Sequence, residues 1–126
     1  ATETPTATPT ATATPTPPPG APGTMHVGSL AGVSGKLAKG NWQARVTVSV
    51  HDSVHGPVGG ATVTLSWSGT LASSTCTTDG TGTCTATSGT IARNVSTVTA
   101  TVSDITHGTL TYASADNHQT SVVVAK

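Results

Sequence analysis

The sequence predicts an all-β protein. We expect a Greek-key β-sandwich of seven or eight short antiparallel strands over residues 24–126, preceded by an extended Thr/Pro-rich arm over residues 1–23. Composition is the first observation: the 126 residues include 28 Thr and 14 Val, and only 8% are charged, which favours strands over helices. The second is that apolar and polar residues alternate with period two. The third is that turn-forming residues recur roughly every 8–12 positions, as in sandwich folds.

The arm is defined by its prolines. Seven of the eight prolines lie within residues 1–22, between threonines and alanines. Such a segment has little apolar surface to bury and each Pro removes a backbone donor, so we expect solvated polyproline II. Thr- and Pro-rich stalks are common carriers of O-linked glycans. The candidate acceptors are Thr4, Thr6, Thr8, Thr10, Thr12, Thr14 and Thr16.

The strands follow from the alternation in the rest of the chain. The clearest case is Ala44, Val46, Val48 and Val50, which alternate with polar residues and so indicate a half-buried strand. Similar alternation recurs after each Gly-containing turn, and no window with a helical period competes. The predicted strands are 26–30, 44–50, 61–67, 71–76, 83–87, 95–104, 110–112 and 122–124.

The two cysteines predict one disulfide. Cys76 and Cys84 flank a turn-like TDGTG segment and share the parity of the inward-facing residues. A bridge over so short a loop stabilises by about 2–3 kcal/mol on a chain-entropy estimate. The alternative, a pair of metal-bound thiolates, lacks the spacing of a zinc site. Because disulfides persist in oxidising compartments, we expect a secreted or cell-surface protein.

Three stretches resemble bacterial extracellular Ig-like domains of the invasin and intimin type, over about residues 40–105. They are GPVGGATV at residues 56–63, TTDGTGT at residues 77–83 and VTATV at residues 98–102. The resemblance implies an Ig-like sandwich that serves as an extracellular spacer, adhesin segment or appendage building block, with no catalytic residues. The cysteine pair across the turn and the high histidine content depart from that family's pattern.

The histidines are the one group that could carry chemistry. Counting strand directions places the 51–60 loop, the turn at Asp79 and the 104–108 turn at one end of the sandwich, with His118 further from that end. Imidazoles and carboxylates together can bind zinc or copper. The alternative is that these histidines only cap turns and bond loop backbone, in which case there is no cofactor. The candidate metal ligands are His51, His55, His107 and Asp104.

Composition disfavours several classes of function. The five carboxylates stand in no motif, and Ser and Thr are too abundant to single out a nucleophile with its base, so we expect no enzyme. Five cations and a net charge of zero do not make the basic surface that nucleic acid requires. No apolar run approaches the roughly 18 residues needed to cross a bilayer.

Two further surface sites are predicted. Trp42 precedes the first clear strand and is expected to be exposed, where it could stack on a sugar, whereas Trp67 and Tyr112 share the inward parity. This supports an alternative function as a carbohydrate- or substrate-binding accessory module of a secreted hydrolase, tethered by the arm. Asn94 opens an N-x-S sequon and is a candidate N-glycan site in a surface turn.

Together these features predict a non-enzymatic building block of a secreted or cell-surface fibre. An arm on a sandwich domain can contact the next subunit, and head-to-tail contacts of this kind generate open filaments. We therefore expect self-association through residues 1–23, with glycans as further partners. A spacer domain of a larger adhesin is the alternative within the same class.

Overall fold

The computed structural model describes residues 23–69 and 71–126. The predicted polyproline arm and its O-glycan acceptors, Thr4 to Thr16, lie outside these described residues. Within them, strands account for most of the chain and two 3₁₀ turns for the helical residues, so the all-β prediction is confirmed. No helix of the described part is long and apolar enough to cross a membrane.

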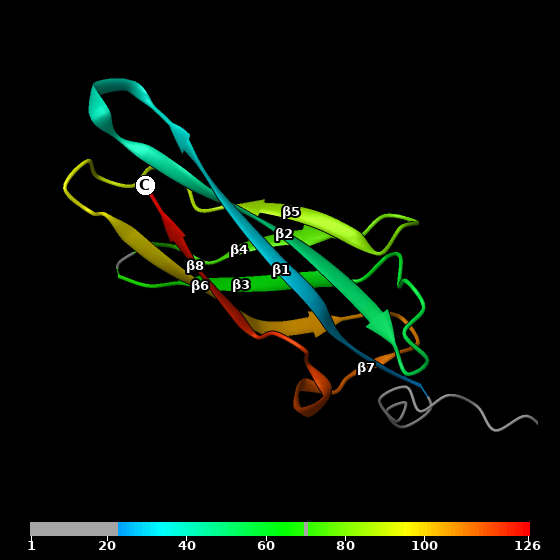
Figure 1. Ribbon diagram of the computed structural model, residues 1–126. Coiled ribbons are helices and arrows are strands. Elements are labelled where there is room, and N and C mark those ends of the chain that lie inside the picture. Colours follow the sequence, from blue (N-terminus) through cyan, green and yellow to red (C-terminus); the bar gives the residue numbers. More distant parts are fainter. Residues whose placement is uncertain (1–22, 70) are drawn as a thin grey trace, which may run out of the picture.

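Eight strands form two four-stranded sheets that pack face to face (Figure 1). The first sheet has the order β5-β2-β1-β7 and the second the order β4-β3-β6-β8. The 3₁₀ turns η1 (Ala38–Gly40) and η2 (Ser114–Asp116) precede β2 and β8. The strands are β1 (Thr24–Lys36), β2 (Trp42–Asp52), β3 (Thr62–Trp67), β4 (Ser74–Thr77), β5 (Thr83–Thr87), β6 (Thr97–Thr106), β7 (Thr111–Tyr112) and β8 (Ser121–Ala125).

Two features of the first sheet differ from the prediction. The first strand is 13 residues long, well beyond the expected 26–30, and forms a long hairpin with β2. The alternation of apolar and polar residues is weak in this strand because Gly28, Gly32 and Gly35 have no side chain to mark a face of the sheet. In addition, β7 pairs with the start of β1 in parallel, whereas all strands were expected to be antiparallel.

The core lies between the sheets and is built mostly from valines and alanines at alternate positions. Along β2, every second residue from Trp42 to Val50 is buried. The prediction that Trp42 is exposed is therefore wrong: the side chain is 1% exposed, and its Nε1–H donates to the Val95 carbonyl at 2.8 Å. Trp42 shares the parity of the inward β2 residues, and Ile91 bridges to it from the facing loop.

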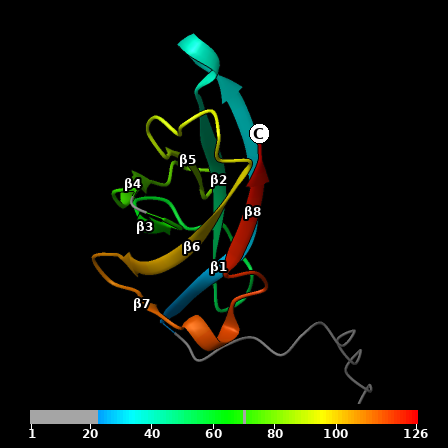
Figure 2. The ribbon, with the colours of Figure 1, turned by 90° about the vertical axis from the view of Figure 1, so that its left-hand side faces the viewer.

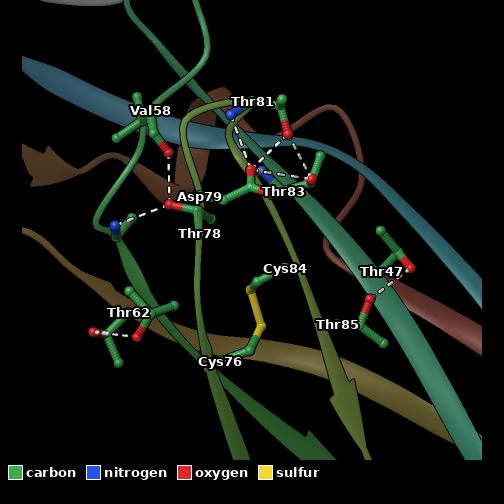
Figure 3. The surroundings of a disulfide bond; sticks show 12 residues. Thr47, Val58, Thr62, Cys76, Thr78, Asp79, Thr81, Thr83, Cys84 and Thr85 are labelled. Carbon is green, nitrogen blue, oxygen red and sulfur yellow. Dashed lines mark hydrogen bonds between the residues drawn. A yellow bond between two sulfur atoms is a disulfide. The ribbon is translucent and has the colours of Figure 1, made fainter.

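The predicted Cys76–Cys84 disulfide is confirmed. It joins β4 to β5, the edge strands of different sheets, so it ties the two layers together along one side of the sandwich (Figure 3). Above it, Asp79 closes the intervening turn by accepting hydrogen bonds from the backbone and hydroxyl of Thr81. These bonds hold the pKa of the Asp79 carboxyl below its usual value.

The long axis of the domain has two distinct ends. The chain enters β1 at one end, beside β7 and η2, and the tip of the β1–β2 hairpin lies at the other (Figure 2). The last residue, Lys126, lies at the hairpin-tip end, where its backbone N–H bonds to the Ser96 carbonyl. The two ends of the described chain are therefore at opposite poles of the sandwich.

Candidate functional site

Charged residues and histidines are segregated between the two ends. The end at which β1 begins, which we call the acidic pole, carries all five histidines and four of the five carboxylates of the sequence, the fifth being Glu3 outside the described residues. The opposite end, which we call the basic pole, carries Lys36, Lys39, Arg93 and Lys126, and the remaining cation, Arg45, lies along β2 in the half of the hairpin nearer this end. The acidic-pole carboxylates are Asp52, Asp79, Asp104 and Asp116.

His26 lies at the centre of the acidic pole. Met25 and Val27 face the core, so His26 faces the outer side of the first sheet, yet it is only 1% exposed. Its partner across the β1–β2 ladder is His51, whose ring stands over Gly28. A β-carbon at Gly28 would overlap that ring, so the glycine, at an irregularity in the ladder, makes room for it.

The loop after β2 brings His55 over His26. The Asp52 carboxylate accepts the backbone N–H groups of Val54 at 3.0 Å and Gly56 at 2.8 Å, and so folds the chain into a tight loop. His55 has a φ of 66°, a left-handed conformation that is uncommon for a residue with a side chain. The loop thus holds an unfavourable backbone conformation at His55, whose ring packs on His26 with 5.2 Å between the ring centroids.

The segment after η2 brings His118 to the same place. Its backbone N–H donates to the Val27 carbonyl at 3.0 Å, and the preceding Asn117 side chain accepts the Val27 N–H at 2.7 Å. Gln119 accepts the Leu30 N–H in the same way. Because these bonds occupy the outer edge of β1, they anchor the exposed His118 beside the buried His26.

The three imidazoles form a nearly equilateral triangle. The ring centroids are 5.1 Å apart for His26 and His118, 5.2 Å for His26 and His55, and 5.3 Å for His55 and His118. One ring nitrogen of each lies within 4.8 Å of the others. His51 packs edge-on against His26 at 5.9 Å, outside the triangle.

Several ring nitrogens of this histidine cluster lack hydrogen-bond partners among the described residues. Within residues 23–69 and 71–126, neither ring nitrogen of His26 or of His55 has a hydrogen-bond partner, nor has Nδ1 of His51, although all of these atoms are buried. Burial, followed by the charges that neighbouring imidazoles would carry, lowers the pKa of His26 and of His51. The rings of His26 and His51 are therefore held neutral, each with one nitrogen lone pair available, at pH values where free histidine begins to protonate.

The predicted ligand set is only partly brought together. His51 and His55 lie in the cluster, but His107 lies apart: its Nε2 bonds the Gly59 carbonyl and its Nδ1 accepts the Thr109 N–H. The Asp104 carboxylate accepts the N–H of Ile105. Sequence analysis missed His26 as a candidate, and the expectation that His118 lies further from this end is wrong. A signal for His26 existed, because it stands in register with His51 once 26–30 pairs with 44–50.

The basic pole is formed by the hairpin tip and its neighbours. Lys36 ends β1 and Lys39 lies within the η1 turn, and the side chain of Lys126 donates to the Arg93 carbonyl at 2.8 Å. A hollow at this pole is lined in part by Lys36, Leu37, Asn41 and Lys126. Asn94 is exposed in a turn at this end, as the sequon prediction required.

A scan against protein-family models, a search of curated proteins and a search of solved structures each found no match for this chain. The resemblance to invasin- and intimin-type domains therefore remains a prediction from the quoted motifs.

Proposed function

We propose that this chain is a non-enzymatic, extracellular structural module that assembles head to tail, with the acidic pole of one copy against the basic pole of the next. The single observation that carries the proposal is the segregation of charge along the domain axis. Surfaces of opposite potential attract and orient each other, whereas like poles repel. An otherwise weakly charged molecule with such an axis therefore favours end-to-end contact in one polarity.

The geometry of the chain supports the same arrangement. Because the contact uses two different surfaces at opposite ends, it is heterologous, and repetition gives an open filament unless it closes into a ring. One long edge of the sandwich is tied by the disulfide, and the β1 edge is covered by Asn117 and Gln119. Both features oppose edge-to-edge pairing of sheets and leave the ends as the natural contact surfaces.

The N-terminal arm is a second element of the proposed contact. Gly23 lies at the acidic pole, where its carbonyl accepts the Thr111 N–H, so residues 1–22 join the domain at that end. In a head-to-tail array, the arm of one subunit starts at the junction with its neighbour. Removing residues 1–22 is expected to weaken self-association, as measured by sedimentation. Unchanged sedimentation would show that the arm takes no part in the contact. The arm would then be a stalk, as in a spacer domain of an adhesin.

Charge reversal tests the polarity directly. One variant reverses the basic pole and the other reverses the acidic pole. The first variant combines Lys36→Glu, Lys39→Glu and Arg93→Glu. The second combines Asp104→Lys, Thr106→Lys and Asp116→Lys. Each variant alone should sediment as a monomer, because both of its ends then carry the same sign. An equimolar mixture should assemble in alternation and dissociate as salt is raised, since the Debye length is only ~10 Å at 0.1 M. A mixture that stays monomeric would contradict the proposal.

The alternative function as a carbohydrate-binding module loses the platform on which it was predicted. Trp42 and Trp67 are 1% and 6% exposed, and the indole N–H of each is bonded inside the protein. Sugar stacking needs an open aromatic face, so neither indole can supply it. We therefore favour the structural class.

A further inference from the structure

We infer that His26, His55 and His118 form a binding site for a divalent transition-metal ion of the zinc class. Nothing in this inference depends on head-to-tail assembly. The cluster brings together residues from β1, from the loop after β2 and from the segment after η2, up to 92 positions apart in the sequence. Their convergence on one point is a property of the fold and not of local spacing.

The unpartnered nitrogens of His26 are the main reason to assign a ligand. Buried polar side-chain atoms are nearly always hydrogen-bonded, and leaving one unpaired carries a free-energy cost. His107, at the same pole, shows the usual structural arrangement, with both ring nitrogens engaged by loop backbone. Among the residues that the structure describes, His26 has no such partner on either nitrogen, and it faces two further imidazoles. A metal ion would satisfy the lone pairs of all three rings at once.

The donor set defines the class of ion. Three neutral imidazoles suit zinc and its neighbours in the first transition row, whereas calcium and magnesium require oxygen ligands. Thiolates are excluded, since both cysteines are in the disulfide. The ligand nitrogens now lie within 4.8 Å of one another, and tetrahedral coordination with Zn–N of ~2.0 Å would draw them to about 3.3 Å.

The surroundings fit an ion of charge +2. Asp116 lies close enough to His26 to favour a positive charge there, and Asp52 does the same for His51. Because His118 is exposed, the side of the triangle toward solvent is open for entry and for a fourth ligand such as water. Binding would clamp the start of β1 to the two segments that cover it.

Zinc titration of the full chain provides the test, with added Zn²⁺ as the probe after treatment with a chelator. We expect one ion per chain by calorimetry and elemental analysis, and a zinc-dependent rise in melting temperature. In NMR spectra, the imidazole signals of His26, His55 and His118 should shift, while that of His107 should not. No bound zinc, or shifts confined to His107, would overturn the inference.

Two variants separate the site from general stability. His118→Ala removes an exposed ligand and should leave the metal-free protein folded, while weakening zinc binding by at least the 10–100-fold typical of lesser changes around metal sites. His107→Gln is the matched control at the same pole and should bind zinc like the parent. Equal zinc affinity in His118→Ala and the parent would refute the assignment.

Discussion

Replacing His26 with Leu separates a metal ligand from a structural histidine. In the metal-free protein, His26 is 1% exposed, and neither of its ring nitrogens has a hydrogen-bond partner in the described part of the chain. Each unsatisfied buried polar atom costs about 1–3 kcal/mol, and a hydrophobic side chain of similar size would remove that cost. Imperfect fit of Leu in a space shaped by three imidazoles would offset part of the gain, typically by less than about 1.5 kcal/mol. Two such nitrogens, less the loss from imperfect fit, leave a net gain of about 0.5–6 kcal/mol, so we expect the variant to be more stable than the parent.

The assay is urea unfolding of both proteins in the presence of a chelator and then in excess zinc. For a domain of about 100 residues, each kcal/mol gained corresponds to roughly 4–8 °C in melting temperature. Zinc at 100 times its dissociation constant would add about 2.7 kcal/mol to the parent by mass action and nothing to the variant. The difference in the free energy of unfolding between the variant and the parent should therefore shrink or change sign when zinc is added.

The opposite result would make His26 a structural residue. If His26→Leu destabilises the metal-free protein by several kcal/mol, the imidazole stabilises the fold through packing or hydrogen bonds and is not a metal ligand. If zinc stabilises both proteins equally, the ion binds elsewhere. His107→Gln serves as the control, since His107 lies at the same pole with both ring nitrogens bonded by loop backbone, and its replacement leaves the three rings in place.

Three other predictions follow from the same structure. Because the pKa values of His26 and His51 are lowered from 6.5, the unfolded chain binds more protons, and the free energy of unfolding in chelator should fall as pH drops below about 6.5; a flat profile between pH 7 and 5 would contradict this. Gly28→Ala should cost about 1–3 kcal/mol by pushing the His51 ring aside, measured by urea unfolding, whereas Gly60→Ala has open space and is strained only by its positive φ. Reducing the Cys76–Cys84 bridge should lower stability by about 2–3 kcal/mol in thermal unfolding with and without reductant, and an unchanged midpoint would show that the sheets need no tie.

The sequence allowed the strands to be predicted wherever alternation was dense. Residues 44–50 lie in β2, and of the predicted strand 61–67 residues 62–67 form β3, because every second side chain is apolar and buried. Counting strand directions also placed the 51–60 loop and the Asp79 turn at one end, which the ladder pairs confirm. These inferences needed only period and parity, which are local properties of the chain.

The choice of partners within that end could not be predicted in the same way. Counting strand directions shows at which end of the sandwich a loop lies, but not on which side of that end. It therefore could not predict that His118 joins the cluster while His107 lies apart from it. His118 joins the cluster because Asn117 and Gln119 bond the outer edge of β1, a contact between residues 90 and 89 positions apart. His26 was hidden because it stands between two core residues, in a run of three buried side chains.

The segregation of charge links the two proposals, although each can fail alone. Zinc at the histidine triangle would place two positive charges among the carboxylates of the acidic pole. Protonation of His26 at low pH would act in the same direction. Both changes reduce the attraction toward a basic pole, so zinc or acid should shift an assembled population toward monomers at constant salt. Zinc that stabilises the monomer yet leaves sedimentation unchanged would show that the junction does not sense the charge at the triangle.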